Sequence, residues 1–333
     1  MRRRLPVLVA SATVAAVSLV GCSTGGSGDG ATGGGGASGA DVTVVATTTI
    51  LGDIAGQVAT CAGGATVQTV MPVGADPHDF SPSSADVAAM VQADVVVANG
   101  LGLEEGLASA IASAQDDGAR VLEVAPALDP LPFAGEGSHE DEGEEHAEEE
   151  GEEDTHGSLD PHVGLDVSRM AQAAVLIGDE LTAATGDDAY AACGQEVSAS
   201  LAETDEEVRT ILAAVPAGSR ILVTDHDAFG YFAEAYDFEV AGVVIPGGST
   251  LAEPSSAEVS ALVATIQEAG VPAIFANTAN PTALVDAVAA ESGEQIAVVE
   301  LYVDSLGPEG SGAATYQEAM VTNATRIADA LAG

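Results

Sequence analysis

The feature that most limits the fold is a regular alternation of short β-branched runs with longer helical stretches from Asp41 onward. The runs are almost continuously apolar, which is typical of parallel strands buried on both faces. They form two blocks of four, at 42–46, 66–70, 94–98 and 120–124, then at 220–224, 239–244, 272–276 and 296–301. Helix candidates between them include 50–59, 84–92, 103–114, 257–269 and 281–292. We therefore predict two α/β lobes, each a mainly four-stranded parallel sheet flanked by helices.

A helical region without strand candidates separates the two blocks. Residues 166–185 and 188–215 carry alanine, leucine and glutamate at helical spacing. We interpret the first as a long helix that joins the lobes and the second as the opening helix of lobe two. The predicted divisions are an N-terminal lobe at 41–165, a linking helix at 166–186 and a C-terminal lobe at 187–333. Ligands of such folds bind beyond the carboxyl ends of strands or between lobes, so functional residues are expected there.

The N-terminus reads as a secretory signal over residues 1–21, with three arginines followed by the apolar run Leu5–Val20. That run is shorter than the roughly 18 residues that a spanning helix needs. Cys22 follows Leu-Val-Gly and resembles the acylated cysteine of a bacterial lipobox; an ordinary signal peptide with an incidental cysteine is the alternative. We predict lipidation at Cys22, which would anchor the protein to the outer face of the cell membrane. A glycine-rich tether is predicted over 22–40.

Charge and cysteine content indicate which partners and which cellular compartment to expect for this protein. The chain has 52 acidic residues, eight arginines and no lysine, for a net charge of −44. Such a surface repels nucleic acid, so no nucleic-acid partner is expected, and we attribute most of the carboxylates to salt adaptation or solubility. With Cys22 acylated, Cys61 and Cys193 form an even pair in an oxidising compartment. A disulfide between them is a hypothesis, with two free thiols as the alternative, because spacing does not establish geometry.

Half of the six histidines lie in a strongly acidic segment at 135–157, namely His139, His146 and His156. A block of like charges without an apolar face cannot pack, so we predict a mobile loop inserted in lobe one. Histidines and carboxylates together can bind a divalent metal weakly. The alternative is a solvated loop in which the histidines have no role.

The other three histidines are His78, His162 and His226. His78 follows the strand candidate 66–70, His162 follows the acidic segment, and each of these two ends an Asp-Pro-His tripeptide; His226 comes directly after another strand candidate. One such histidine would usually be structural, but three at strand exits or the lobe junction favour a metal site. Three imidazoles and one carboxylate form the tetrahedral set that suits zinc, and Asp304 follows the last strand. We predict a single ion in the cleft, with two ligands from each lobe.

Five motifs then resemble one family in order along the chain: Gly74–Ser83, Asp160–Val163, His226–Phe232, Ala252–Ser255 and Asp304–Gly307. They resemble the metal-binding solute receptors of ABC importers, the ZnuA/TroA-like group known as cluster A-I. The resemblance implies two α/β lobes bridged by one long helix, with metal bound at His78, His162, His226 and Asp304. It also implies a monomer that delivers the transported Zn²⁺ to an ABC permease and its ATPase. The manganese and iron branches carry a carboxylate at the position of His226, so the resemblance favours the zinc branch.

Some details depart from the family pattern or leave alternatives open. The family often has Asp-Pro-His-Val-Trp-Leu-Asp-Pro, where this chain has Gly164 and Val167 in place of the tryptophan and the second proline, which leaves the local packing open. Asp225 and Asp227 flank His226 and are expected to orient its ring rather than bind metal. The main alternative is the same receptor class for Mn²⁺ or Fe²⁺. A surface adhesin and a zinc hydrolase are further alternatives, although four protein ligands leave no open position for catalysis.

Overall fold

The computed structural model describes residues 42–133, 159–293 and 296–332. Several predicted features lie outside these residues: the signal segment 1–21, the lipidation site Cys22, the tether 22–40, and the acidic loop with His139, His146 and His156. Within the residues that the structure describes, none of the helices is both long enough and apolar enough to cross a membrane.

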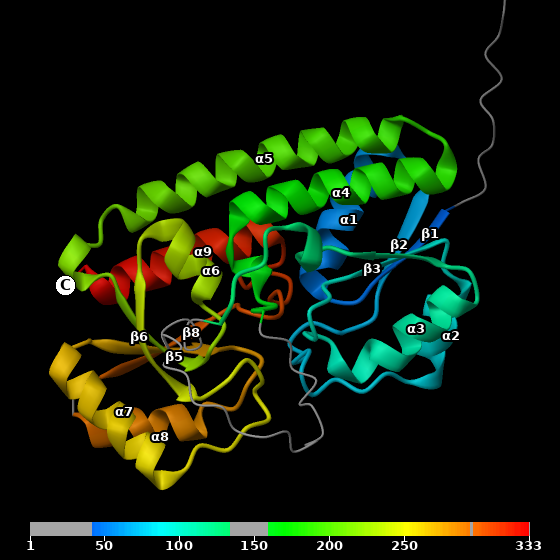
Figure 1. The fold of residues 1–333 in the computed structure, drawn as a ribbon. Helices are drawn as coiled ribbons and strands as arrows, with labels where there is room; N and C mark the ends of the chain where they lie inside the picture. The colour runs from blue at the N-terminus through cyan, green and yellow to red at the C-terminus, as the bar shows by residue number, and fades with distance from the viewer. Residues whose placement is uncertain (1–41, 134–158, 294–295, 333) are drawn as a thin grey trace, which may run out of the picture. The chain divides into compact units, whose positions relative to one another are not determined.

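Two four-stranded sheets, all of whose paired strands are parallel, form the centres of the two lobes, as the alternation predicted (Figure 1). The first sheet has the order β2-β1-β3-β4 and the second the order β6-β5-β7-β8. In both, the chain turns to opposite sides of its first strand, and the carboxyl ends of strands at such a switch point border a crevice. The strands are β1 Val42–Ala46, β2 Ala65–Thr69, β3 Val95–Ala98, β4 Arg120–Glu123, β5 Ile221–His226, β6 Glu239–Ile245, β7 Ala273–Asn277 and β8 Ala297–Leu301.

Each sheet buries both faces against helices, which explains the almost unbroken apolar strands. In lobe one, Val44 packs in the core with α1 and α4, while its neighbour Val45 packs in a separate core with α2 and α3. In lobe two, Val223 faces α7 and α8. The helices are α1 Thr49–Ala62, α2 Ser84–Gln92, α3 Ala108–Asp116, α4 Val167–Thr185, α5 Ala189–Leu212, α6 Gly230–Tyr236, α7 Ser256–Ala269, α8 Ala283–Ser292 and α9 Tyr316–Leu331.

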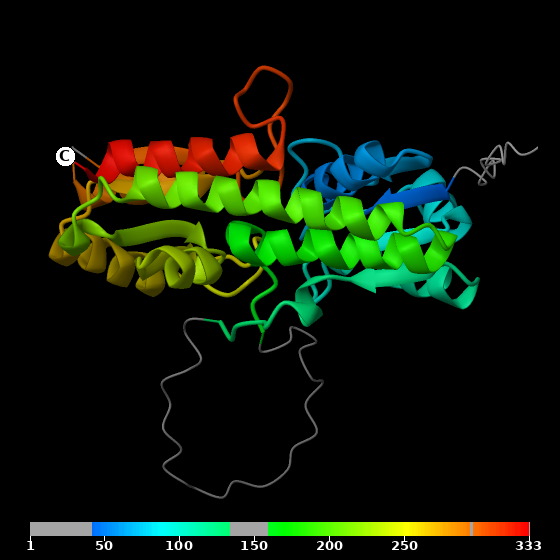
Figure 2. The ribbon, with the colours of Figure 1, turned by 90° about the horizontal axis from the view of Figure 1, so that it is seen from above.

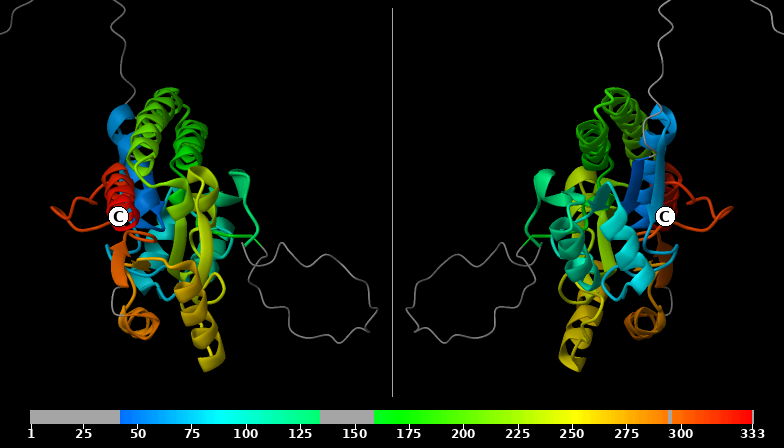
Figure 3. Two further views of the ribbon diagram at one scale, coloured as in Figure 1. Left: turned by 90° about the vertical axis from the view of Figure 1, so that its left-hand side faces the viewer. Right: turned by 90° about the vertical axis from the view of Figure 1, so that its right-hand side faces the viewer.

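Helices α4 and α5 form an antiparallel pair on one side of both sheets (Figures 2 and 3). Helix α4 ends at Gly186, whose φ of 75° reverses the chain. Helix α5 then contacts α1 of lobe one and α9 of lobe two. Its 24 residues span roughly 36 Å, enough to reach both. We predicted that residues 166–186 join the lobes; in the structure α4 packs on lobe one, and its Arg169 also lies over the ring of Tyr231 in α6 of lobe two.

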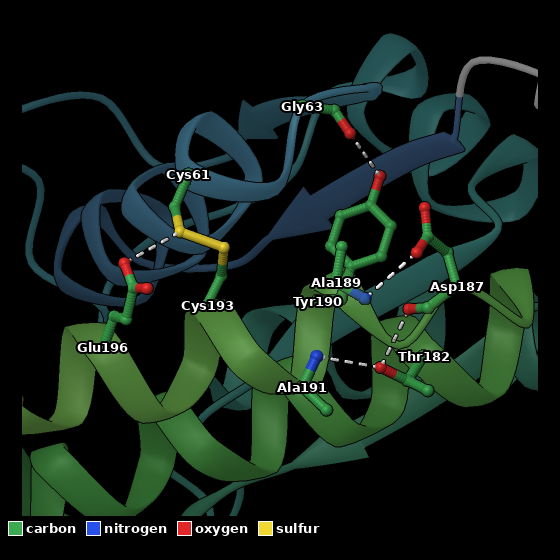
Figure 4. The surroundings of a disulfide bond; sticks show 9 residues. All are labelled: Cys61, Gly63, Thr182, Asp187, Ala189, Tyr190, Ala191, Cys193 and Glu196. Carbon is green, nitrogen blue, oxygen red and sulfur yellow. Dashed lines mark hydrogen bonds between the residues drawn. A yellow bond between two sulfur atoms is a disulfide. The ribbon is translucent and has the colours of Figure 1, made fainter. Parts of the chain in front are cut away.

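A disulfide fastens α5 to lobe one (Figure 4). Cys61 of α1 and Cys193 of α5 are bonded, with their Cα atoms 5.7 Å apart. One turn away, the hydroxyl of Tyr190 donates a hydrogen bond to the carbonyl of Gly63 at 3.2 Å. The structure therefore contains the bond that the sequence left as a hypothesis, and it places this bond between α1 and the helix that spans both lobes.

The sequence analysis missed two helices, α6 and α9. Helix α9 buries Ala324, Ile327 and Leu331, which have helical spacing, and the side chain of Thr315 caps it by accepting a hydrogen bond from the amide of Glu318. Its apolar periodicity and its cap could have revealed it. Helix α3 begins later than the predicted 103–114 because residues 105–107 form a 3₁₀ turn.

Candidate metal centre

The structure brings the four predicted ligands together from four different segments. His78 lies in the loop between β2 and α2, His162 directly precedes the 3₁₀ helix η3 Val163–Leu165, His226 ends β5, and Asp304 follows β8. One possible ligand atom from each residue lies within 4.8 Å of all the others. The four residues are almost fully buried, with exposed fractions of 4%, 4%, 0% and 7%. Such convergence of polar groups in a dry position is typical of a binding site.

The imidazole Nε2 atoms lie at the centre of this cluster. The Nε2 atoms of His78 and His162 are 3.3 Å apart, and Nε2 of His226 is 3.5 Å from Oδ2 of Asp304. This last contact is too long for a good hydrogen bond, and Nε2 of His226 is buried without a hydrogen-bond partner among the described residues. An unsatisfied buried nitrogen is costly, whereas a cation at the centre could bind it. The donor set therefore fits a metal ion.

Two of the imidazoles are oriented by carboxylates on their far side. Oδ1 of Asp160 accepts hydrogen bonds from the amide and Nδ1 of His162, at 2.9 and 2.8 Å. Oδ1 of Asp225 does the same for His226, at 2.9 Å each. Because a carboxylate only accepts, each Nδ1 carries a proton, and it is Nε2 of each ring that faces the cluster. Of the two aspartates that flank His226, it is thus Asp225 that holds the ring.

The ligands of lobe two are connected by a residue that the sequence analysis did not identify, Asn277. Its side-chain amide donates to Oδ2 of Asp304 at 2.6 Å, and its backbone amide donates to Oδ2 of Asp225 at 2.7 Å. A hydrogen-bonded chain therefore runs from the ring of His226 to the carboxylate of Asp304. Asn277 is fully buried at the end of an apolar strand, and that polar residue after a buried run was the available signal.

Electrostatics couple the two ligands of lobe two. Burial lowers the pKa of His226, but the hydrogen bond to Asp225 and the interaction with Asp304 outweigh it and raise this pKa to about 10. Burial favours a higher pKa for Asp304, but His226 and the other two histidines hold it below its usual value. Without metal, His226 and Asp304 thus form an imidazolium–carboxylate pair. A metal ion would take the place of the proton on His226.

The structure accounts for the packing at Gly164. The hydroxyl of Tyr316, in α9, donates to the carbonyl of Gly164 at 2.8 Å. A Cβ atom at this position would lie 3.5 Å from Cδ1 of Ile50, which is ordinary contact. Gly164 also lines a cavity of about 20 Å³ beside His162 and Asp304. The backbone next to His162 is therefore fixed by a bond from lobe two.

Two lobes of parallel sheet, with a buried cluster of imidazoles and a carboxylate between them, define the class of two-lobed metal receptors. The family described as "Zinc-uptake complex component A periplasmic" matches residues 44–330, and the chain belongs to this family. Manganese-binding lipoprotein MntA of Halalkalibacterium halodurans is 32% identical over 282 residues, which are 84% of this chain and 85% of that protein. Zinc-binding protein TroA of Treponema pallidum is 31% identical over 291 residues, 85% and 88% of the two chains.

Solved structures confirm the predicted fold. The structure of the periplasmic zinc-binding protein TroA from Treponema pallidum matches with a TM-score of 0.73 and 28% identity, over 87% of this chain and 99% of that one. A manganese-bound periplasmic metal-binding protein from Candidatus Liberibacter asiaticus matches with a TM-score of 0.72 over the same shares, at 22% identity, which shows the fold alone. The family comprises solute-binding receptors rather than enzymes, so the chain is a metal-binding substrate-binding protein of an ABC importer.

Proposed function

We propose that this receptor captures Zn²⁺ in the cleft through His78, His162, His226 and Asp304 and delivers it to the permease of an ABC importer. The observation that carries the proposal is the convergence of three buried imidazoles and one carboxylate within 4.8 Å. Zinc is commonly held by four such nitrogen and oxygen ligands in a tetrahedron. Asp160, Asp225 and Asn277 support it by orienting three of the four ligands before the ion arrives.

The second candidate is a receptor for Mn²⁺, or for Fe²⁺, in the same cleft. The name of the relative MntA, which is 32% identical, favours manganese. However, manganese suits carboxylate, carbonyl and water ligands, whereas imidazoles suit zinc. Because only one of the four clustered ligands is a carboxylate, the chemistry of this chain favours zinc over the metal in its relative's name.

A competition experiment separates the two candidates. The metal-free protein would be dialysed against equal concentrations of Zn²⁺ and Mn²⁺, and the retained metal measured by mass spectrometry. We expect one zinc ion per chain and little manganese, and the same measurement on His226→Ala should show neither at the tight site. Retention of manganese in preference to zinc would reject the zinc assignment while leaving the receptor class intact.

The acidic loop is proposed as a weak auxiliary site through His139, His146 and His156. It would raise the local metal concentration without forming the tight site. Titration calorimetry of the intact protein and of a variant lacking residues 135–157 would test this. We expect the deletion to remove weak binding events only. Loss of the tight event on deletion would show that the loop supplies part of the main site.

Delivery would take place at the outer face of the cell membrane. We propose that Cys22 is lipidated after removal of residues 1–21 and that a monomer docks on the permease, whose ATPase drives uptake. The lipoprotein name of the relative MntA supports the anchor. Fractionation of cells that express wild type or Cys22→Ala would check it: the wild type should be found with membranes and the variant released.

A further inference from the structure

The loop that carries His78 is joined to lobe two at two points. The inner point lies beside the metal ligands, where the amide of Gly74 donates to the hydroxyl of Ser305 at 2.8 Å. Ser305 is buried, with an exposed fraction of 2%, and its hydroxyl is also 3.3 Å from that of Thr49. This contact joins the loop to the residue that follows the metal ligand Asp304.

The outer point is a hydrogen bond between side chains of the two lobes. The hydroxyl of Thr250, in the loop after β6, donates to Oδ2 of Asp76 at 2.5 Å. Both residues are half-buried. A short hydrogen bond to a carboxylate is among the stronger ones that a neutral hydroxyl can make.

The same carboxylate also holds the backbone of a metal ligand. Oδ1 of Asp76 accepts a hydrogen bond from the amide of His78 at 2.9 Å. Pro77, between them, fixes its own φ and stiffens the connection. A displacement of Thr250 would therefore move Asp76 and, through it, the backbone of His78.

The remaining ligands are anchored by side chains of their own lobe. Asp160 holds the ring of His162, Asp225 that of His226, and Asn277 the carboxylate of Asp304. Asp76 differs because its second oxygen bonds across the cleft. His78 is thus the ligand whose supporting carboxylate itself bonds to the opposite lobe, whereas Asp160 meets that lobe through its carbonyl, which accepts from the hydroxyl of Tyr231 at 2.7 Å.

Both arms of the cross-cleft bond contain a glycine with positive φ. Gly74 has a φ of 81° and Gly247 a φ of 87°, and a Cβ at either would meet nothing within 4 Å. Backbone conformation rather than close packing therefore favours glycine at both positions. Two turns of this kind, each within three residues of the bond, are suitable places for the loops to bend when the bond opens.

We propose that the Thr250–Asp76 hydrogen bond is a latch that couples closure of the cleft to the position of His78. The inference rests on the proposed function, because it concerns how the captured ion is retained. With the latch closed, His78 is held against the other three ligands. When it opens, His78 withdraws first, while His162, His226 and Asp304 stay in place, so metal release begins at one named ligand. Thr250 and Asp76 are positioning residues in this scheme.

The rate of zinc dissociation tests the latch. Zinc-loaded protein would be mixed rapidly with an excess of chelator and dissociation followed for wild type, Thr250→Val, Thr250→Ser and Ser249→Ala. We expect about tenfold faster dissociation for Thr250→Val, the factor that corresponds to loss of a typical charge-assisted hydrogen bond. Thr250→Ser keeps the hydroxyl and should restore the wild-type rate. Ser249, whose hydroxyl accepts from Leu251 within the same loop, is the matched control and should leave the rate unchanged.

Amide hydrogen exchange supplies a second readout with an internal control. The amides of His78 and His162 each donate to an aspartate Oδ1 at 2.9 Å. In Thr250→Val the amide of His78 should exchange faster, while that of His162 should keep its wild-type rate. General loosening of the fold would accelerate both and overturn the latch.

The outcomes distinguish the latch from the proposed function. If wild type binds zinc and Thr250→Val releases it at the wild-type rate, the latch is wrong and the zinc receptor stands. Failure of Thr250→Ser to restore the wild-type rate would also overturn the latch. If wild type binds no zinc at all, both the latch and the zinc assignment fall.

Discussion

The two Asp-Pro-His tripeptides of this protein have the same sequence, but their aspartate carboxylates accept different hydrogen bonds. In both, the histidine amide donates to Oδ1 of the aspartate two residues earlier at 2.9 Å. At Asp160 that oxygen also accepts from Nδ1 of its own histidine, at 2.8 Å. At Asp76 the second oxygen instead accepts from Thr250 in the opposite lobe. The tripeptide therefore specifies a local turn, and the surroundings decide whether its carboxylate orients a ring or joins two lobes.

The difference follows from where each tripeptide lies. Asp160 comes just before η3 and α4, where the hydroxyl of Tyr231 also binds its carbonyl at 2.7 Å. Asp76 lies in the loop between β2 and α2, where Thr250 of the loop after β6 donates to its carboxylate. Both motifs therefore meet the second lobe, the first through the carbonyl of Asp160 and the second through the carboxylate of Asp76. The predictions below test whether this division of roles holds.

Removal of either motif histidine should have the largest effect. His78→Ala and His162→Ala each delete one of four ligands, and we expect zinc affinity to fall more than about a hundredfold, beyond the effect of changing a supporting residue. Competition with a chelator of known affinity would measure it. His146→Ala, in the acidic loop, is the control and should retain the tight site. Near wild-type affinity in either ligand variant would remove that histidine from the site.

Replacing each of the two aspartates by asparagine should lower zinc affinity by different amounts. Asp160→Asn weakens the acceptor that orients His162, and we expect zinc affinity to fall about tenfold to a hundredfold. Asp76→Asn keeps an acceptor for the amide of His78 but removes the charge from the bond to Thr250, so its affinity should fall by less than about tenfold. Calorimetric titration of the pair compares them directly. Equal losses would mean that the two aspartates have the same role.

Acidification should weaken binding by a smaller and graded amount. The pKa of His226 is raised to about 10 in the metal-free protein, so its ring is protonated at neutral pH and zinc has to displace that proton. Below this pKa, each unit of falling pH should raise the apparent Kd about tenfold for one released proton. Calorimetry in buffers of different ionisation enthalpy would count the protons. Release of none would show that the ring of His226 is already neutral in the metal-free protein.

The smallest effect on metal binding is expected from the disulfide, which joins α1 to α5 rather than either motif. Cys61→Ser combined with Cys193→Ser should lower the free energy of unfolding of the metal-free protein by about 2–4 kcal/mol. Zinc affinity should change by less than about threefold, because the four ligands keep their local supports. Urea unfolding and zinc titration of the same double variant would measure both quantities. A large loss of affinity would show that the α1–α5 connection also positions the ligands.

Much of the lobe architecture was predictable because buried parallel strands leave a strong apolar signal. The eight strand candidates correspond to β1–β8 with shifts of one or two residues at their ends. Helix α9, which packs on α5, was not predicted, although its buried residues have helical spacing. Residues 166–186 did form a helix, but the contacts of α5 with α1 and α9 could not be read from helical spacing.

The predicted ligands were found because few histidines are available and each has a distinctive neighbourhood. The residues that support them were harder to predict. Asp160 and Asp225 adjoin their histidines in sequence, whereas Asn277 lies 27 residues before Asp304, and only the pairing of β5 with β7 brings it near His226. Local motifs therefore identified the predicted metal ligands. The pairing of the strands determined which more distant groups orient those ligands.

By itself the sequence determined the two-lobed α/β class, the candidate ligands and the local turn of each Asp-Pro-His, because apolar periodicity and proline act over a few residues. Only the tertiary structure decided that the four ligand atoms meet within 4.8 Å, that Cys61 reaches Cys193, and that Asp76 bonds to Thr250. The last two pairs are separated by 132 and 174 residues, and their proximity depends on how two separate sheets pack against one helical pair. The aspartate of an Asp-Pro-His motif can accept a hydrogen bond from its own histidine ring or from a distant hydroxyl, and the position of the opposite lobe determines which.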